Sequence, residues 1–429
     1  MNISAEGLSE EQSGRDKSKH LRGKDKPSMS GQVDTCACGI AKDQRVALWD
    51  NVKMALITMV VVGHFIEPYV GDSHLLKALF LFIYSFHMPL FFFVAGLFHK
   101  NERIKEKTLG FLSIYIAFKV VVALSTAVCG KGFSLSLLKE SGAPWYMLAM
   151  AVFVCVTYLL RNVNPKAVLL LAVALACCAG YDKSIGDVLA ASRIIVFFPF
   201  YYVGSVFPKA KVEQLAARRN WKMIGLAILL VWLAICYFQI DVVYVLRHLF
   251  TGRNPYNDTV RHIGWIVRLG CYALTTLAGM GIILIMPTKK LGYLTTVGTR
   301  TLQIYFWHIP IRNILRYTGC LDRLMAMGAP GKLLLLLAAV CVVLLCSVKP
   351  LEQPTAYLMK AFGERTAGKL EMNREGLKKK ALLWIPIALF FSFSVLFYGP
   401  LGIYLSNAQE LWFSLGTVLK IVGFMALAG

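Results

Sequence analysis

The feature that most constrains this chain is a series of long apolar runs that recur from residue 50 to the C-terminus. A run of about 20 apolar residues can cross a hydrocarbon core of about 30 Å as a helix, which satisfies its own backbone hydrogen bonds in lipid. Hydrophobic residues make up 57% of the 429 residues and charged residues only 16%, unlike ordinary soluble domains. The sequence therefore predicts an all-α, polytopic transmembrane helix bundle.

The runs divide into about ten core helices and a C-terminal helical hairpin. The predicted spans cover residues 50–69, 75–98, 109–128, 145–160, 167–181, 190–207, 223–240, 262–286, 300–318, 332–348, 381–400 and 410–428. The polar stretches between and before them predict the following domain plan. It comprises a disordered basic tail (1–45), a ten-helix membrane core (46–348), a basic linker (349–380) and the terminal hairpin (381–429).

The distribution of basic residues predicts the orientation. Most of the 46 Lys and Arg lie in the tail and in alternate gaps between spans, with clusters at 100–107, 209–222 and 349–380. Because loops on the cytoplasmic side retain Lys and Arg, we expect a cytoplasmic N-terminus, in the plasma membrane or an endomembrane. The net charge of +22 then reflects topology and attraction to anionic membrane lipid. No basic segment carries the interleaved aromatics of a nucleic-acid platform, so nucleic acid is not an expected partner.

The first span carries the ionisable residues with the clearest spacing. Lys53 and His64 are eleven residues apart, which places both on one helix face with about 16 Å between them. Asp50 precedes Lys53 by three residues, and Glu67 follows His64 by three, where it can orient the imidazole. Carboxylate and imidazole together suggest a general base. Two structural alternatives stay open: Lys53 snorkels to the inner surface, and Glu67 only ends the helix.

Two later spans also contain histidines. His87 precedes Pro89 in the second span, and His308 precedes Pro310 in the ninth. Since proline removes a backbone donor, both helices are expected to kink and to present imidazoles at a similar depth. Ionisable groups inside a membrane usually serve a function, but a hydrogen-bonded structural histidine is the alternative for each.

Further polar and aromatic groups lie at the predicted outer side. Arg193 at the start of the sixth span suits snorkelling or binding of a polar acceptor. Trp145 at the start of the fourth suits an aromatic belt or stacking on a sugar. The loop 241–261, with Tyr244 and Tyr256, is predicted to contact the acceptor. The cysteines show no metal-site spacing beyond a Cys-x-Cys in the tail, so no metal is expected.

Taken in order, four stretches resemble the acyltransferase 3 family of membrane acyltransferases, and within it the fucose 4-O-acetylase-like branch. They are Asp50-x-x-Lys53 with Gly63-His64, Phe86 to Gly96, Arg193 to Gly204, and Gly298 through Thr301, Tyr305 and His308. The resemblance covers residues 45–348. It implies a ten-helix bundle that passes an acyl group, usually acetyl from acetyl-CoA, to a hydroxyl of a carbohydrate or similar acceptor.

The same resemblance assigns expected roles to individual residues. His64 matches the family's essential histidine, and Lys53 matches the basic residue eleven positions before it. Lys53 and Arg103, on the basic inner face, are expected to bind the acyl-CoA donor. Arg103 lies in a segment where the family often has several cytoplasmic arginines, but here it is the one arginine and is accompanied by two acids. Tyr305 and His308 are expected to support the site.

Two mechanisms and one rival function follow. His64 either deprotonates the acceptor hydroxyl, with Glu67 stabilising the imidazolium, or is itself acylated first. The rival is a proton-coupled secondary transporter in which Lys53, His64 and Glu67 form a relay. Such transporters are commonly built from repeated halves, and the sequence shows no convincing internal repeat.

Overall fold

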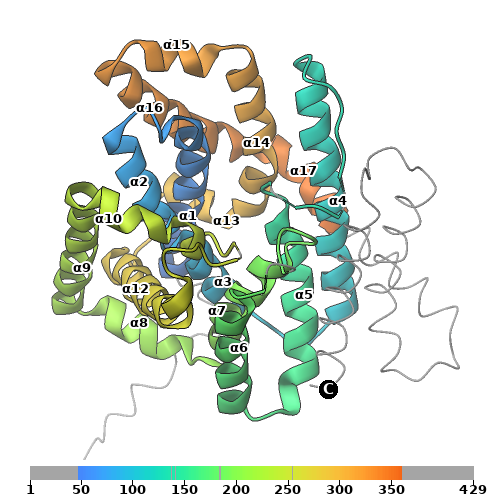
Figure 1. Cartoon of the computed structure of the whole chain (residues 1–429). Coiled ribbons are helices and arrows are strands. Elements are labelled where there is room, and N and C mark those ends of the chain that lie inside the picture. Colours follow the sequence, from blue (N-terminus) through green and yellow to red (C-terminus); the bar gives the residue numbers. More distant parts are fainter. Residues whose placement is uncertain (1–46, 137, 141, 183–184, 254, 360–429) are drawn as a thin grey trace, which may run out of the picture. The chain divides into compact units, whose positions relative to one another are not determined.

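The computed structural model describes residues 47–136, 138–140, 142–182, 185–253 and 255–359 (Figure 1). Over these ranges the chain is helical and has no strand, apart from an isolated antiparallel bridge between Lys139 and Val188. The all-helical prediction is confirmed for this part of the chain. The predicted tail (1–45), the terminal hairpin (381–429) and most of the linker lie outside the described residues.

The described elements follow one another with short connections. They are α1 (Ala47–Ile66), η1 (Glu67–Tyr69), α2 (His74–Tyr84), α3 (His87–Leu97), α4 (Ile104–Val128), α5 (Trp145–Leu159), η2 (Leu160–Asn162), α6 (Pro165–Ala179), α7 (Ala191–Val206), α8 (Lys209–Ala217), α9 (Arg219–Phe238), α10 (Ile240–Val243), η3 (Tyr244–Leu246), α11 (Arg247–Phe250), η4 (Arg261–Ile263), α12 (Gly264–Ile285), α13 (Tyr293–Thr299), α14 (Thr301–Tyr317), α15 (Cys320–Ala326), α16 (Ala329–Cys346), η5 (Lys349–Leu351) and α17 (Glu352–Tyr357).

Each of the ten predicted core spans contains a helix, but the helices differ in length. Among the described residues, seven helical segments are long and apolar enough to cross a membrane, or eight if α7 and α8, bent by 85° at their junction, form one span. The helices α6 and α14 are shorter, with 15 and 17 residues, and α14 also carries arginines. The chain is thus a multi-pass membrane protein, and the count of ten crossings stays a prediction.

The second predicted span is broken between α2 and α3. Pro89 has no N–H to donate to the carbonyl of Ser85, one turn earlier. That carbonyl instead accepts a hydrogen bond of 2.6 Å from the Thr275 hydroxyl of α12. The break therefore falls just before His87, which begins α3, and not at Pro89 itself.

Helix α1 packs against α3, α13, α14 and α16. Near its start, the Asn51 amide donates to the carbonyl oxygens of Pro287 (2.8 Å) and Lys289 (2.9 Å) and accepts from the Thr295 hydroxyl (2.7 Å). Gly298 lies so close to Asp50 that a Cβ there would collide with the Asp50 carbonyl. These contacts fix the start of α1, and with it the register of the face that carries Lys53 and His64.

A second close crossing joins α3 and α7. A Cβ on Gly96 would collide with the Tyr201 carbonyl, and a Cβ on Gly204 with the Phe93 carbonyl. Small residues at such crossings let helix backbones approach closely, which is how helices associate in lipid. The crossing holds α7 against the second half of α3, the helix that begins at His87.

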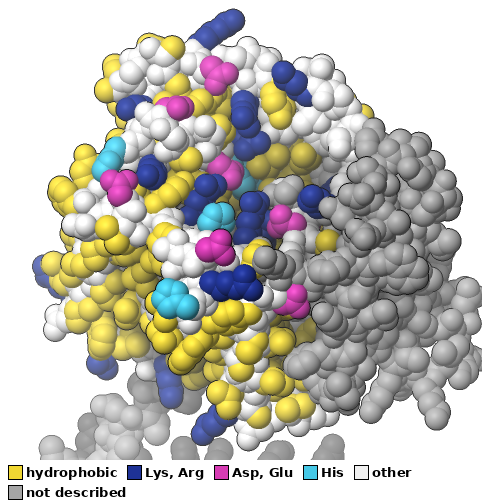
Figure 2. All heavy atoms as spheres, in the orientation of Figure 1, with side chains coloured by type: hydrophobic (Ala, Val, Ile, Leu, Met, Phe, Trp, Pro, Cys, Tyr) yellow, Lys and Arg dark blue, Asp and Glu magenta, His cyan; other side chains and the backbone are white. Residues whose placement is uncertain are grey.

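Large apolar side chains remain exposed on several helices. They include Leu230, Val231 and Phe238 of α9, Trp265 and Ile266 of α12, and Leu333 and Leu345 of α16. Figure 2 shows hydrophobic side chains over much of the lower left of one face, whereas charged and histidine side chains gather nearer its middle. Exposed apolar helix faces of this kind suit contact with lipid.

Candidate functional site

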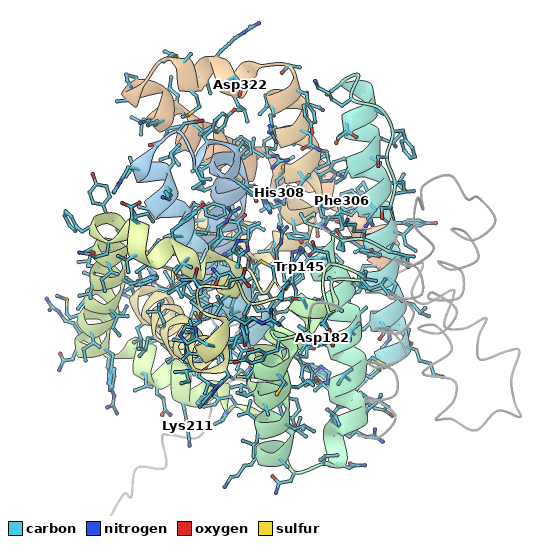
Figure 3. All side chains as sticks on the ribbon, in the orientation of Figure 1. Trp145, Asp182, Lys211, Phe306, His308 and Asp322 are labelled. Atoms are coloured by element: carbon cyan, nitrogen blue, oxygen red, sulfur yellow. The ribbon has the colours of Figure 1, made fainter. Side chains whose placement is uncertain are left out.

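The two ends of the bundle provide a frame for the site. Tyr69, which follows α1, donates a hydrogen bond of 2.6 Å from its hydroxyl to Asp322. Near the start of α1, Lys53 lies over the Phe98 ring at 5.8 Å, and Lys209 of α8 over the same ring at 5.1 Å. Helix α1 thus runs from the end that carries Lys211 to the end that carries Asp322, with His308 at an intermediate level (Figure 3).

His64 and Glu67 form the predicted pair on α1 and η1. The His64 Nδ1 lies 3.4 Å from Glu67 Oε2, and the two side chains are 21% and 38% exposed. When Glu67 accepts a hydrogen bond from Nδ1–H, the lone pair on His64 Nε2 is available to act as a base. Both groups are accessible, so a substrate can reach them.

A second imidazole lies beside His64. The His308 ring of α14 is fully buried, and its centroid is 5.3 Å from that of His64. The His308 Nδ1 donates to the carbonyls of Tyr305 (2.8 Å) and Ile304 (3.1 Å), while its buried Nε2 has no hydrogen-bond partner among the described residues. Because Nδ1 holds the proton, Nε2 is an acceptor left unused by the fold.

The structure pairs His308 with His64 and gives His87 other contacts. The His87 Nδ1 donates to the Ile83 carbonyl at 2.8 Å, and its ring lies 4.7 Å from the Tyr84 ring. His87 is thus hydrogen-bonded within its own broken helix. Tertiary packing brings α1, and not α3, next to His308.

Arg312 is a site residue that the sequence reasoning missed. One turn after His308, its Nη1 donates to the His64 carbonyl at 3.3 Å and its Nη2 to Asn313 at 2.8 Å. Asn313 in turn donates to the Ser125 hydroxyl of α4 at 3.0 Å. The sequence did contain a pattern that could have identified it, an arginine four residues after a histidine within a predicted span. A charge inside a membrane span is costly and usually serves a function.

An apolar pocket of about 250 Å³ lies between α1, α3, α4, α5 and α14. Its lining includes Ile57 and Val60 of α1, Met88 and Phe91 of α3, Phe111, Met147 and Met150, and Thr301 and Tyr305 of α14. Val60 is one helical turn before His64, and the Tyr305 ring is 5.7 Å from that of His308. The pocket therefore reaches to within one turn of both imidazoles, on their Lys211 side.

Two loops lie beside this pocket and are held by buried charges. In the stretch between α4 and α5, Glu140 forms an ion pair of 2.6 Å with Lys119 of α4. The Ala143 carbonyl in the same stretch accepts a hydrogen bond from the Tyr305 hydroxyl. The stretch before α7 joins it, because the Glu140 N–H donates to the Asp187 carbonyl at 2.9 Å. Tyr305 thus contacts both the pocket and this loop.

Arg193 and Trp145 belong to the same buried network. The Arg193 guanidinium pairs with Asp187 at 3.0 Å, donates to the Glu140 carbonyl at 3.2 Å and lies 5.2 Å from the Trp145 ring. Trp145 is only 9% exposed and packs against Phe92 and Phe197. Neither residue has the lipid-facing position of a snorkelling arginine or a belt tryptophan. Their contacts instead hold the two loops together.

The remaining predicted residues lie toward the Lys211 end. Lys53 forms an ion pair of 2.7 Å with Asp50, as the three-residue spacing suggested. Arg103 immediately precedes α4, is 59% exposed and pairs with Glu106 at 3.4 Å. The structure shows no contact between Arg103 and the histidine pair. In the described ranges, no three His, Cys, Asp or Glu side chains come together as a metal site would require.

The comparisons with known proteins agree with this picture at the level of a family. The acyltransferase 3 family model, described as an acyltransferase domain, matches residues 46–349. That range contains the histidine pair, Arg312 and nearly all of the pocket lining. No curated protein and no solved structure matches the chain.

Proposed function

The chain belongs to the acyltransferase 3 family, and on that premise we propose that this membrane acyltransferase moves an acetyl or other acyl group from acyl-CoA to a hydroxyl of a carbohydrate or similar acceptor. The observation that carries the proposal is the pocket that ends next to the His64 and His308 imidazoles. A thioester at the end of that pocket would lie beside two imidazoles with free acceptor atoms.

The pocket suits the acyl end of the donor. Its lining is almost wholly apolar, which matches an acyl chain and the carbon skeleton of a pantetheine arm. At about 250 Å³ it has room for only part of the donor, so the nucleotide must lie outside it. At the Lys211 end, the ammonium groups of Lys53 and Lys209 lie 5.8 and 5.1 Å from the Phe98 ring. The two charges suit the phosphates of the donor, and the ring suits its base. We place that end in the cytoplasm, where acyl-CoA is available.

His64 acts as the general base of the transfer. His64 Nε2 takes the proton of the acceptor hydroxyl as its oxygen attacks the thioester carbonyl. A C–O bond forms, the C–S bond breaks, and the proton passes to the departing thiolate of coenzyme A. Glu67, 3.4 Å from Nδ1, stabilises the imidazolium between these steps. A route through an acylated His64 uses the same groups in two displacements.

A proton relay along α1 is less well supported by the geometry. The Lys53 ammonium is already paired with Asp50 at 2.7 Å. Three helical turns, or about 16 Å, separate it from His64, and the pocket-facing residues between them, Ile57 and Val60, are apolar. A relay needs exchangeable groups within hydrogen-bond reach of one another, and this stripe has none between its ends.

The test is acetyl transfer by the purified full chain in lipid nanodiscs with labelled acetyl-CoA and a mixture of glycans. His64→Ala should lower turnover by at least about a hundredfold, the usual contribution of a general base. His262→Ala, a substitution of an exposed histidine, is the matched control and should retain activity. Near-normal turnover of His64→Ala would reject the base assignment. Proton flux without acetyl transfer would favour the transporter.

A further inference from the structure

Two arginines from different helices lie near the His64 and Glu67 pair. Arg312 comes from α14 and donates to the His64 carbonyl, and its buried Nε has no hydrogen-bond partner in the described part of the chain. Arg247 comes from α11, within the loop predicted to contact the acceptor, and lies 5.0 Å from the Phe80 ring. Both side chains are half-buried.

A stack of aromatic rings connects Arg247 to α1. The Phe80 ring stacks on the Tyr84 ring at 3.9 Å. Tyr84 lies so close to Gly63 that a Cβ there would be 2.9 Å from its ring, and Gly63 directly precedes His64. Arg247 is therefore connected through this pair of rings to the end of α1 that carries His64.

Positive charges outnumber negative charges around His64 and Glu67. Arg247 and Arg312 both interact electrostatically with Glu67 and with the Tyr84 hydroxyl. Neither guanidinium has a carboxylate within ion-pair distance among the described residues. Glu67 is engaged by His64, and the nearby Asp322 accepts from Tyr69. Two guanidinium groups thus lie near one carboxylate that is already hydrogen-bonded.

Half-buried charges without counter-ions are costly, so an arrangement of this kind suits a ligand that supplies the missing negative charge. Guanidinium groups present paired N–H donors that match the oxygens of a carboxylate or a phosphate. Arg312 and Arg247 both lie at the end of α1 that carries His64, and an acceptor hydroxyl must also lie at that end. A neutral acceptor would bring no negative charge to balance these two guanidinium groups.

From this geometry we infer that the acceptor is an acidic saccharide, whose carboxylate or phosphate binds Arg247 and Arg312 while a neighbouring hydroxyl faces His64. The inference rests on the proposed acyltransferase function and narrows its acceptor class. It assigns Arg247 as a specificity-determining residue that contacts the acceptor and not the acyl donor.

The test compares three matched probes in neutral-lipid nanodiscs: glucose, glucuronic acid and glucose 6-phosphate. Their affinities are measured by calorimetry on the full chain, without donor. We expect at least one acidic probe to bind about tenfold or more tightly than glucose, since hydrogen bonds to charged groups contribute at that level. The uronic acid and the phosphate separate the two possible sources of negative charge. Raising the salt concentration should weaken only the acidic probes.

Variants test whether Arg247 causes the difference in affinity between acidic and neutral probes. Arg247→Gln should lower the acid-to-neutral affinity ratio to near one, and Arg247→Lys should restore part of it. Arg323→Gln, which removes an exposed arginine next to Asp322, is the matched control and should leave the ratio unchanged. Equal binding of all three probes by the wild-type chain, including no measurable binding of any, would overturn the inference. So would an unchanged ratio in Arg247→Gln.

The two proposals fail differently. If the acidic probes bind through Arg247 but no acetyl is transferred to any saccharide, the acyltransferase proposal fails and the anion site stands. If acetyl is transferred to neutral and acidic saccharides alike, and Arg247→Gln does not change their ratio, the enzyme stands and the acidic acceptor is wrong.

Discussion

Replacing Lys119 by methionine tests how the loops beside the pocket are held. The Lys119 Nζ is 2.6 Å from Glu140 Oε2, and the two side chains are only 9% and 2% exposed. Lys119 also donates to the Lys139 carbonyl at 3.3 Å, while the second oxygen of Glu140 accepts from the Gly142 N–H at 3.1 Å. Lys119→Met fills a similar volume but leaves a buried carboxylate with one backbone donor.

The expected cost follows from which partner remains. Removing one member of a buried ion pair costs about 3–5 kcal/mol, because the other charge stays desolvated. Removing both charges together, in Lys119→Met/Glu140→Gln, is often close to neutral and should cost about 1 kcal/mol or less. The single variant should therefore be much less stable than the double variant, although it carries fewer changes.

Thermal unfolding of the purified protein in detergent provides the measurement. At about 2 °C per kcal/mol for a chain of this size, Lys119→Met should lower Tm by about 6–10 °C. The double variant should recover most of that loss. Lys131→Met, which removes an exposed lysine, is the control and should shift Tm little. If the single and double variants unfold at the same temperature, the buried pair does not hold the loop and this reasoning is refuted.

Three further predictions address the site and the packing. His308→Gln should lower kcat for acetyl transfer by about a hundredfold with little change in Tm, because Nε2 is not used by the fold; unchanged kcat would remove His308 from the reaction. Lys53→Ala should weaken acetyl-CoA binding in calorimetry relative to Lys166→Ala, and equal affinities would exclude Lys53 from the donor site. Gly204→Ala should destabilise the fold by about 1–3 kcal/mol through its collision with α3, whereas Gly71→Ala, with open space around it, should not; equal Tm values would contradict the close crossing.

Local features of the site followed from the sequence. The helical period placed Asp50 against Lys53 and His64 against Glu67, and the structure shows both contacts at 2.7 and 3.4 Å. The apolar runs likewise predicted helices at the right positions. Such predictions succeed because residues three or four apart on a helix are neighbours whatever surrounds them.

Helix α14 lies close to its predicted span, 300–318, but whether it crosses the membrane was less predictable. Helix α14 ends at Tyr317 and holds Arg312, whose donors bind the His64 carbonyl and Asn313. An apolar window cannot show that such a charge is satisfied by another helix. The number of crossings therefore depends on tertiary partners as well as on hydropathy.

The apolar runs and the helical period thus determined that this chain is a multi-pass helical protein and which residues of α1 share a face. Tertiary structure alone decided that His308 lies beside His64. It also decided that Arg312 donates a hydrogen bond to the carbonyl of His64, from which it is separated by 248 positions in the sequence. It also turned Arg193 inward to Asp187 and buried Trp145 beneath it. The physical reason is that contacts within one helix follow from its period, whereas contacts between helices depend on close crossings such as that of Gly298 on Asp50, which no local pattern encodes.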